Sequence, residues 1–312
     1  MGKTHSRQTY VYKTVQGCQI RADVYGATGR GPRPVILWLH GGALIFGDRR
    51  HLLSEQRELY LSAGYTVVSA DYRLAPEVKL EAILEDVSDA YRWVREQGPG
   101  LFGSNPDRIA VIGHSAGGYL TLMAGWMVRP RPQALVSFYG YGDIAGAWYS
   151  RPDPHYLKEP AVTPEAARRG VGGPVLTGTP SAGAAHRRWL FYLFCRQQGL
   201  WPQEVAGHDP QADPQAFDRF CPDRNVAPDY PPTLLLHGDR DTDVPIELSR
   251  RMAAALQAQH VRHRLVTMEG MGHVFDALPD GSLEGRPRGM KHPRVAEAFA
   301  AVLAFLSEYM DR

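Results

Sequence analysis

The segment IAVIGHSAGGYLTLMAG, residues 109–125, carries the signal that most strongly constrains the fold. It begins with a short, almost wholly apolar run, which is typical of a strand buried on both faces, and continues into a sequence that can form a helix. Ser115 stands between the two, with Gly113 and Gly117 two residues to either side. A strand, a sharp turn and a helix in this order predict a nucleophile elbow, a strained turn that holds a serine hydroxyl clear of the backbone.

Buried-strand patterns recur along the chain and alternate with helical ones. The apolar runs are VILWLH (35–40), YTVVSAD (65–71), RIAVIG (108–113), ALVSFYG (134–140), TLLLHG (233–238) and VRHRLVTM (261–268). Helical spacing is clearest in EAILEDVSDAYRWVREQ (81–97), whereas YVYKTV (10–15) and QIRADVY (19–25) alternate as half-buried antiparallel strands do. The chain is therefore predicted to be an α/β protein with a doubly wound, mostly parallel sheet.

Residues 140–231 interrupt this alternation. The segment is rich in proline and glycine, and it contains one aromatic helical stretch, HRRWLFYLFCRQQGLW (186–201). The glycine-rich part fits a linker or a disordered segment, but an aromatic helix needs an apolar surface against which to be buried. We therefore expect a partly ordered cap inserted after the sixth strand. Residues 1–139 and 232–312 then form the α/β core.

Composition excludes several function classes. Lys and Arg total 35 against 33 Asp and Glu, and the basic residues are spread along the chain, so neither nucleic acid nor an anionic membrane is an expected partner. No apolar run approaches the length of a membrane span, and the start, MGKTHSRQTYVYK, lacks the apolar middle of a signal peptide, which favours a cytoplasmic protein. The sequence does not decide the oligomeric state, and a homodimer is one state that it allows.

Scattered cysteines give no sign of a metal site. Cys18, Cys195 and Cys221 lack the close paired spacing of a disulfide framework or a metal cluster, and we expect idle or buried thiols.

A serine hydroxyl needs a histidine to take its proton and an acid to fix the tautomer of that histidine. TLLLHGDRDTDVP places Asp239, Asp241 and Asp243 in the loop after a late core strand, and VTMEGMGHVF places His273 after the next strand. We choose Asp241 as the acid, because Asp239 can cap the loop and Asp243 precedes the next helix as an expected N-cap. Asp243 remains the reserve. The predicted catalytic residues are Ser115, Asp241 and His273.

The loop HGGALIFG (40–47) is predicted to supply an oxyanion hole. Its glycines let backbone amides approach a substrate carbonyl oxygen closely. We expect the amides of Gly42, Ala43 and Ala116 to bind the oxyanion, with Gly41 as a turn glycine beside them. His40 and His237, which end core strands before glycine, are expected to hold their loops by hydrogen bonds.

Five motifs, taken together, resemble the α/β-hydrolase superfamily, and within it the esterases related to hormone-sensitive lipase and acetyl esterase. They are HGGALIFG (40–47), DYRLAPE (71–77), GHSAGGYL (113–120), HGDRDTDVP (237–245) and GMGHVF (270–275). The chain departs from that group in having HGGA and GHSAG in place of the usual HGGG and GDSAG. The resemblance implies ester hydrolysis through an acyl-enzyme with no cofactor and no metal. It also implies that Ser115 is the nucleophile, His273 the general base and Asp241 its partner.

The predicted function is a serine carboxylesterase for small or short-chain acyl esters, aryl esters included. Two alternatives stay open: an amide hydrolase using the same triad, either an aryl formamidase or an exopeptidase, and a non-catalytic binding protein with the hydrolase fold. Aromatic residues are candidates for the substrate pocket, although the spacing of those on the aromatic helix equally describes a helix that packs on the core. The candidates just past a strand end are Tyr139, Tyr141 and Trp148, and those of the aromatic stretch are Trp189, Phe191, Tyr192, Phe194 and Trp201.

Overall fold

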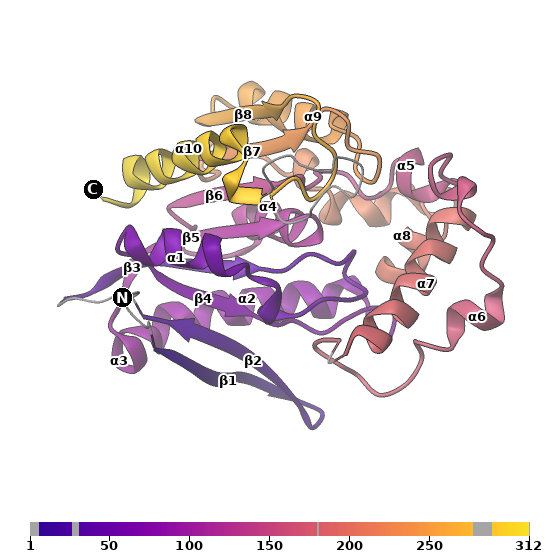
Figure 1. Ribbon diagram of the computed structural model, residues 1–312, viewed down its shortest axis with the longest axis horizontal. Helices are drawn as coiled ribbons and strands as arrows, with labels where there is room; N and C mark the ends of the chain where they lie inside the picture. The colour runs from indigo at the N-terminus through magenta and orange to yellow at the C-terminus, as the bar shows by residue number, and fades with distance from the viewer. Residues whose placement is uncertain (1–5, 27–30, 180, 277–288, 312) are drawn as a thin grey trace.

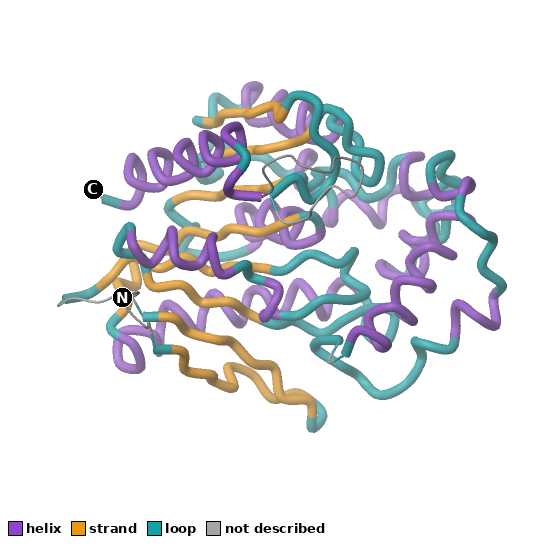
Figure 2. The backbone as a smooth tube through the Cα atoms, in the orientation of Figure 1, coloured by secondary structure: helices purple, strands orange, loops and turns teal. Residues whose placement is uncertain are grey.

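One eight-stranded sheet organises the computed structural model, which describes residues 6–26, 31–179, 181–276 and 289–311 (Figures 1 and 2). The strand order is β1-β2-β4-β3-β5-β6-β7-β8; β1–β2 and β2–β4 pair antiparallel, and all other pairs are parallel. The strands are β1 (Arg7–Val15), β2 (Cys18–Tyr25), β3 (Arg33–Leu39), β4 (Thr66–Ala70), β5 (Ser104–His114), β6 (Ala134–Phe138), β7 (Thr233–Gly238) and β8 (His263–Met268). The predicted doubly wound, mostly parallel sheet is confirmed.

The central strands are buried on both faces, which explains why their sequences are continuously apolar. In β3, Val35, Leu37 and Leu39 join one hydrophobic cluster, while Ile36 and Trp38 join the other. Helices α2 (Leu80–Glu96), α4 (Ala116–Met127) and α9 (Glu247–Ala258) contribute to the first cluster, and α1 (Ser54–Ser62) and α10 (Pro293–Met310) to the second. A short helix, α3 (Gly98–Phe102), precedes β5.

The segment between β6 and β7 forms helices that lie beyond one end of the parallel strands (Figure 1). These helices are α5 (Ala147–Ser150), α6 (Pro164–Arg168), α7 (Ala182–Gln198) and α8 (Trp201–Ala206). The longest, α7, begins after Ser181, whose side chain accepts a hydrogen bond from the Ala184 amide, and ends at Gly199 in the left-handed conformation. Short 3₁₀ turns complete the chain, namely η1 (Arg49–His51), η2 (Tyr156–Lys158), η3 (Pro214–Phe220), η4 (Pro222–Arg224) and η5 (Gly289–Lys291).

A buried arginine connects this segment to the core. The Arg188 guanidinium of α7 forms a two-pronged ion pair with Glu77 at 2.8 and 2.9 Å, and it also donates to the carbonyl oxygens of Ile45 and Ala75. Asp71, at the start of the same 71–77 stretch, binds the backbone and side chain of Arg49. The stretch is therefore a structural tie between the core and residues 140–231.

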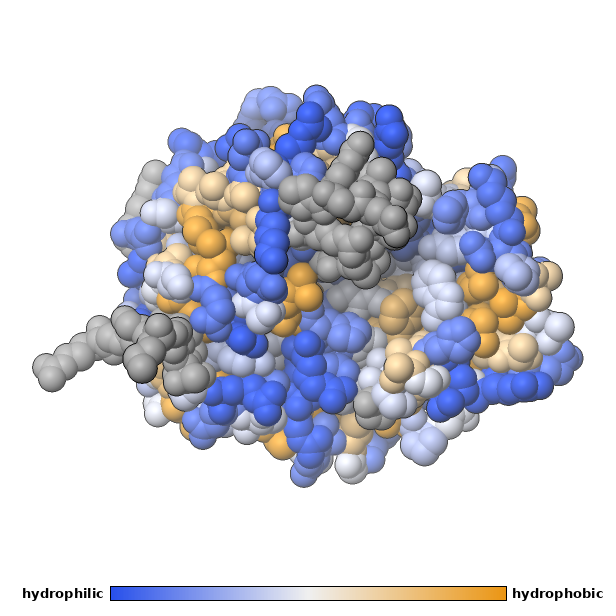
Figure 3. Space-filling model, in the orientation of Figure 1, coloured by the Kyte–Doolittle hydropathy of each residue, from blue (hydrophilic) through white to orange (hydrophobic). Residues whose placement is uncertain are grey.

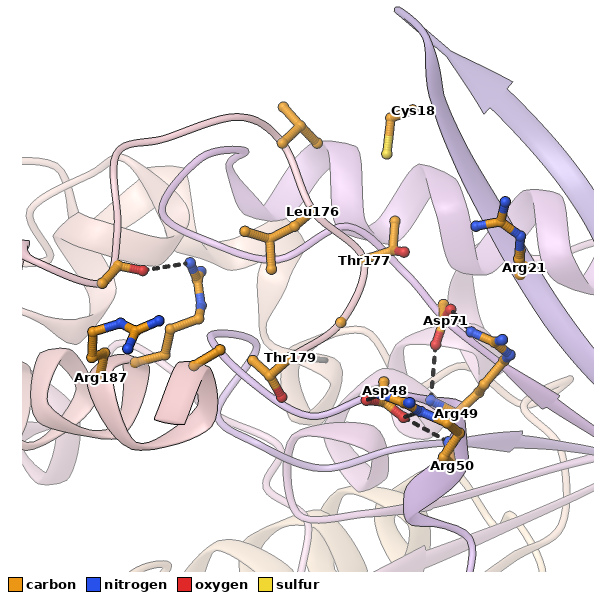
Figure 4. Close-up of a pocket in the computed structure, with 15 residues that line it drawn as sticks. Cys18, Arg21, Asp48, Arg49, Arg50, Asp71, Leu176, Thr177, Thr179 and Arg187 are labelled. Carbon is orange, nitrogen blue, oxygen red and sulfur yellow. Dashed lines mark hydrogen bonds and ion pairs between the residues drawn. The ribbon is translucent and has the colours of Figure 1, made fainter. Parts of the chain in front are cut away.

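A hollow of about 620 Å³ lies between the β1–β2 hairpin and residues 170–188 (Figure 4). Arginines line it, but Arg49 is paired with Asp71 and Arg50 with Asp48, as the dashed lines show. These guanidinium groups hold the surrounding loops together.

Polar and charged residues cover much of the face shown in Figure 3, and apolar residues gather there in separate patches. In the part of the chain that the structure describes, no helix is both long and apolar enough to cross a membrane.

Candidate active site

Ser115 occupies a strained turn between β5 and α4. Its backbone angles are φ 55° and ψ −117°, in a region that residues with a side chain rarely adopt. Glycine is required two residues before and two residues after Ser115, because a side chain at either position would clash with the backbone. A Cβ on Gly113 would lie 2.0 Å from the Gly117 carbonyl oxygen, and a Cβ on Gly117 would lie 2.1 Å from the Leu39 carbonyl oxygen. The two glycines therefore let the turn close tightly against the end of β3.

His273 lies between Ser115 and Asp241. Its Nε2 is 3.0 Å from Ser115 Oγ, and its Nδ1 is 2.7 Å from Asp241 Oδ2. Because an ionised carboxylate can only accept hydrogen bonds, Nδ1 carries the proton and Nε2 is left to accept one from the serine hydroxyl. The three predicted residues, which come from three loops, are thus joined in one hydrogen-bonded chain.

The Asp241 carboxylate is fixed on both of its oxygens. Oδ1 accepts the backbone amides of Asp243 and Val244 at 2.9 and 2.8 Å, while Oδ2, already bound to His273, also lies 3.2 Å from His237 Nε2. Burial acts to raise the pKa of Asp241, but the contacts with His237 and His273 outweigh it and hold this pKa well below its ordinary value. Asp241 therefore stays ionised at neutral pH.

His237 supports the acid in a way that its sequence position alone did not indicate. Its Nδ1 lies 2.7 Å from Ser249 Oγ, and its Nε2 lies 2.9 Å from the Val244 carbonyl oxygen. His40, the other histidine that ends a strand, stacks on Tyr72, and burial lowers the pKa of His40 to about 3. The predicted structural roles of both histidines are confirmed.

Asp243 does not cap the following helix, so that prediction was wrong: the residue before α9 is Ile246, and no side chain caps the helix. Instead, Asp243 Oδ1 accepts hydrogen bonds from the hydroxyls of Tyr156 and Tyr192 and from Arg196. Its Oδ2 lies 3.4 Å from His273 Nε2. Tertiary partners on residues 140–231 thus determine the position of this carboxylate.

Three carboxylates influence the pKa of His273. Burial acts to lower this pKa, but the charge of Asp243, followed by the hydrogen bond and charge of Asp241 and then the charge of Asp276, raises it above the ordinary value. The imidazolium form is therefore stabilised at this position.

The loop after β3 brings its backbone next to the serine. A Cβ on Gly41 would lie 2.9 Å from the His114 carbonyl oxygen and 3.3 Å from Ser115 Cβ, so Gly41 packs directly on the elbow. Gly42 and Ala43 have positive φ angles of 110° and 53°. Within the described residues, the amides of Gly42, Ala43 and Ala116 have no protein acceptor. Ala116 is the first residue of α4, where backbone amides lack partners within the helix.

A cavity of about 730 Å³ opens at Ser115 and His273. Gly41, Gly42 and Ala43 contribute to its wall, as do three of the predicted pocket residues, Tyr139, Trp189 and Tyr192. Aromatic residues that the sequence did not single out as pocket residues also line it, namely Trp38, Phe46 and Tyr156. Its size and apolar lining are typical of a small-molecule site.

Five predicted pocket residues do not line this cavity, and the expectation for them is corrected. Tyr141 is fully buried, with its ring stacked on that of Tyr119, and Trp148 stacks on Tyr149. The other three are buried in the hydrophobic core, namely Phe191, Phe194 and Trp201. Both sides of α7 are covered, one by the cavity and one by the core, so aromatic spacing alone could not assign each ring to a side.

A buried carboxylate that the sequence did not reveal links the histidine loop to the elbow. Asp276 lies three residues after His273, is 1% exposed and accepts hydrogen bonds from the Tyr139 hydroxyl and the Gln56 amide. Its Oδ2 is also 3.1 Å from Nε2 of His114, the neighbour of Ser115. Asp276 thus holds the loop of the base against the turn of the serine, and only long-range contacts show this.

No metal site is apparent. Among residues 6–26, 31–179, 181–276 and 289–311, no group of three or more His, Cys, Asp or Glu side chains has an arrangement that could hold a metal ion. The three cysteines are free, and Cys195 and Cys221 are buried.

Comparison with known proteins gives a family match over most of the chain. Residues 36–277 match the family model described as the alpha/beta hydrolase fold. Among curated proteins, the chain is 28% identical over 88% of its length to the non-reducing polyketide synthase adrD of Penicillium roqueforti. It is 30% identical over 91% of its length to the non-reducing polyketide synthase ausA of Aspergillus calidoustus. It spans only 13% and 14% of the lengths of these two synthases.

Solved structures share the fold along nearly the whole chain. A Staphylococcus aureus Mu50 protein of unknown function matches with a TM-score of 0.76 and 22% identity, covering 98% of this chain and 99% of that one. An alpha/beta hydrolase superfamily protein of Enterococcus faecalis matches with a TM-score of 0.73 and 24% identity, covering 98% of this chain and 100% of that one. The thermostable carboxylesterase EstE1, cloned from a metagenomic library, matches with a TM-score of 0.67 and 22% identity, covering 99% of this chain and 89% of that one. At these identities the likeness establishes a common fold.

Proposed function

The chain belongs to the alpha/beta hydrolase fold family, and we propose that it is a serine carboxylesterase that hydrolyses small or short-chain acyl esters, aryl esters included, through an acyl-enzyme. The observation that carries the proposal is the hydrogen-bonded chain of Ser115, His273 and Asp241 at a cavity lined in part by aromatic side chains. This arrangement is the one by which a serine hydroxyl becomes a nucleophile at neutral pH.

In the first step, Ser115 Oγ attacks the carbonyl carbon of the ester. His273 Nε2, 3.0 Å away, takes the hydroxyl proton as the new C–O bond forms. The imidazolium that results is stabilised by Asp241, which accepts the Nδ1 proton as a hydrogen bond but does not take it up.

The carbonyl oxygen becomes negatively charged in this step. The amides of Gly42, Ala43 and Ala116 are available to bind it, since they have no acceptor among the described residues and lie on the two turns that meet at Ser115. Each such donor typically contributes about 3 kcal/mol to the stability of the transition state.

The tetrahedral intermediate then breaks down. His273 returns its proton to the leaving alcohol oxygen as the ester C–O bond breaks, which leaves the acyl group on Ser115. A water molecule next adds to the acyl carbonyl while His273 Nε2 takes its proton, and the acid is released when Ser115 Oγ regains that proton.

Residues 140–231 act as the cap in this proposal. They supply Tyr156, Trp189 and Tyr192 to the cavity wall, while loops of the core carry the reacting groups. Specificity for the acyl or alcohol part of the substrate is therefore assigned mainly to the cap.

Turnover of p-nitrophenyl esters from acetate to palmitate tests the proposal, with an aryl formamide and aminoacyl anilides assayed beside them. We expect ester hydrolysis that is fastest for short acyl chains, and labelling of Ser115 by a fluorophosphonate that peptide mass spectrometry locates.

Ser115→Ala is the control for both measurements. Absence of turnover on every ester would overturn the proposal, as would labelling that persists in the alanine variant. Turnover of the formamide or the anilides with no ester hydrolysis would instead assign the same site to amide hydrolysis.

A further inference from the structure

The end of the cavity that holds the reacting groups carries an excess of negative charge. Two carboxylates line the cavity, Asp243 and Asp276, and a third, Asp241, lies directly behind His273. Arg50, the one arginine in the described lining, has its guanidinium bound by both oxygens of Asp48 at 2.9 and 2.6 Å. Its charge is therefore already compensated.

Arg196 does not remove this excess. It is fully buried beside the cavity and pairs with two carboxylates, those of Asp153 and Asp243. One guanidinium against two carboxylates leaves one negative charge in this group. Since Coulombic interactions are stronger where water is excluded, that charge acts on whatever occupies the cavity.

The two oxygens of Asp243 differ in how well they are satisfied. Oδ1 accepts three hydrogen bonds, from Tyr156, Tyr192 and Arg196. Among the described residues, Oδ2 contacts His273 Nε2 at 3.4 Å, which is longer than an ordinary hydrogen bond. Oδ2 therefore keeps capacity to interact with a donor or a cation beside the reacting atoms.

Aromatic rings form the wall next to this carboxylate. Trp189 and Tyr192 have ring centroids 5.4 Å apart, Tyr156 lies 5.7 Å from Tyr192, and Phe46 lies 6.1 Å from both Trp189 and Tyr192. Faces of Trp and Tyr attract cations, and the Arg196 guanidinium already lies 4.8 Å from the ring centroid of Tyr156 and 5.7 Å from that of Tyr192. A carboxylate beside further aromatic rings is a combination suited to an ammonium group.

We propose that the preferred substrates are esters that carry an ammonium group, bound by Asp243 and the wall formed by Phe46, Tyr156, Trp189 and Tyr192. The proposal rests on the esterase function proposed above. It names the substrate class of the same site: the ester carbonyl lies at Ser115 while the cationic group lies against the wall.

A pair of isosteric esters tests this inference, because acetylcholine and 3,3-dimethylbutyl acetate differ in the charge of one atom and hardly in shape. We expect kcat/KM to be about tenfold higher for acetylcholine in the wild-type protein. Tetramethylammonium chloride should also inhibit p-nitrophenyl acetate hydrolysis competitively, compared with sodium chloride at equal ionic strength.

Variants assign the preference to this site. Asp243→Asn and Trp189→Leu should each bring the acetylcholine to dimethylbutyl acetate ratio close to one, measured at the pH plateau of each variant. Leu53→Ala, an aliphatic position in the same cavity wall, is the matched control and should affect both esters alike.

Equal kcat/KM for the two esters in the wild-type protein would overturn the inference. So would a preference that survives both Asp243→Asn and Trp189→Leu. In either case hydrolysis of the neutral ester would leave the proposed esterase function intact, whereas failure to hydrolyse either of these esters or any p-nitrophenyl ester would refute that function itself.

Discussion

Gly117→Ala should damage the elbow without unfolding the protein. The added Cβ would lie 2.1 Å from the Leu39 carbonyl oxygen and 2.5 Å from that of His40. Both neighbours are backbone atoms at the end of β3, which no rotamer change can move. The start of α4 and the end of β3 must therefore separate by about 1 Å, and overpacking of this kind typically costs about 1–3 kcal/mol.

The same displacement should reduce turnover more than stability. Ser115 directly precedes α4 and Ala116 begins it, whereas Gly42 and Ala43 follow β3. A separation of the two elements therefore pulls the serine away from the amides of Gly42 and Ala43, which are proposed to bind the oxyanion. A misplacement of about 1 Å can cost about 100-fold in rate. We expect kcat for p-nitrophenyl acetate to fall by about that factor.

Gly100→Ala is the matched control, because Gly100 lies within α3 and an added Cβ there would meet nothing within 4 Å. Alanine favours a helix over glycine by about 1 kcal/mol, so this variant should be at least as stable as the wild type and equally active. Urea unfolding followed by tryptophan fluorescence gives the free energies of unfolding. The steric argument would be refuted if Gly117→Ala had a free energy of unfolding within about 0.5 kcal/mol of the wild type and a kcat within about threefold of it.

Other substitutions separate the roles within the site. Ser115→Ala should lower turnover at least about 10⁴-fold with an unchanged unfolding midpoint, and retained activity would exclude it as the nucleophile. Asp241→Asn should cost about 10⁴-fold in kcat, and far greater damage from Asp243→Asn would reverse the assignment of the acid. Asp243→Asn should move the acid limb of the pH profile of kcat/KM to lower pH, because the charge of Asp243 raises the pKa of His273 and the base must be neutral to act. An acid limb that stays in place or moves to higher pH would contradict this expectation. Asp276→Asn should lower kcat about 10–100-fold with a smaller change in KM, measured with p-nitrophenyl acetate, and an unchanged kcat would remove its positioning role.

The strand pattern made the core predictable from sequence. The central strands β3 and β5 have buried runs that begin at Val35 and Ile109, and these runs are almost wholly apolar. This signal can be read from each segment alone, without knowledge of its neighbours. The position of Ser115 at the turn could also be predicted from the sequence. The need for glycine at positions 113 and 117 arises from contacts within and beside a single turn.

Features that depend on contacts between distant segments could not be predicted. Asp276 stands close to His273 in sequence, but its partners are Gln56, His114 and Tyr139, which no local pattern relates to it. Asp243 had the local signature of a helix N-cap, and tertiary hydrogen bonds from residues 140–231 determined its position instead.

The aromatic helix illustrates a different limit. Trp189 and Tyr192 lie at the cavity while Phe191 is buried in the core, yet all three occur within four consecutive residues. Periodicity identifies the faces of a helix but not what each face meets, so the residues that line the cavity could be assigned only once the fold placed α7.

Arg188 limits how residues 140–231 could be exchanged between proteins of this fold. Its guanidinium satisfies carbonyl oxygens of Ile45 and Ala75, which belong to the core, and it pairs with Glu77 from the same side. A chimaera that imports another segment between β6 and β7 without a guanidinium at this point would leave a carboxylate and two carbonyl groups without their donor, at about 1–3 kcal/mol for each buried group. Replacement of this segment in the laboratory should therefore succeed only when both halves of this contact are transplanted together.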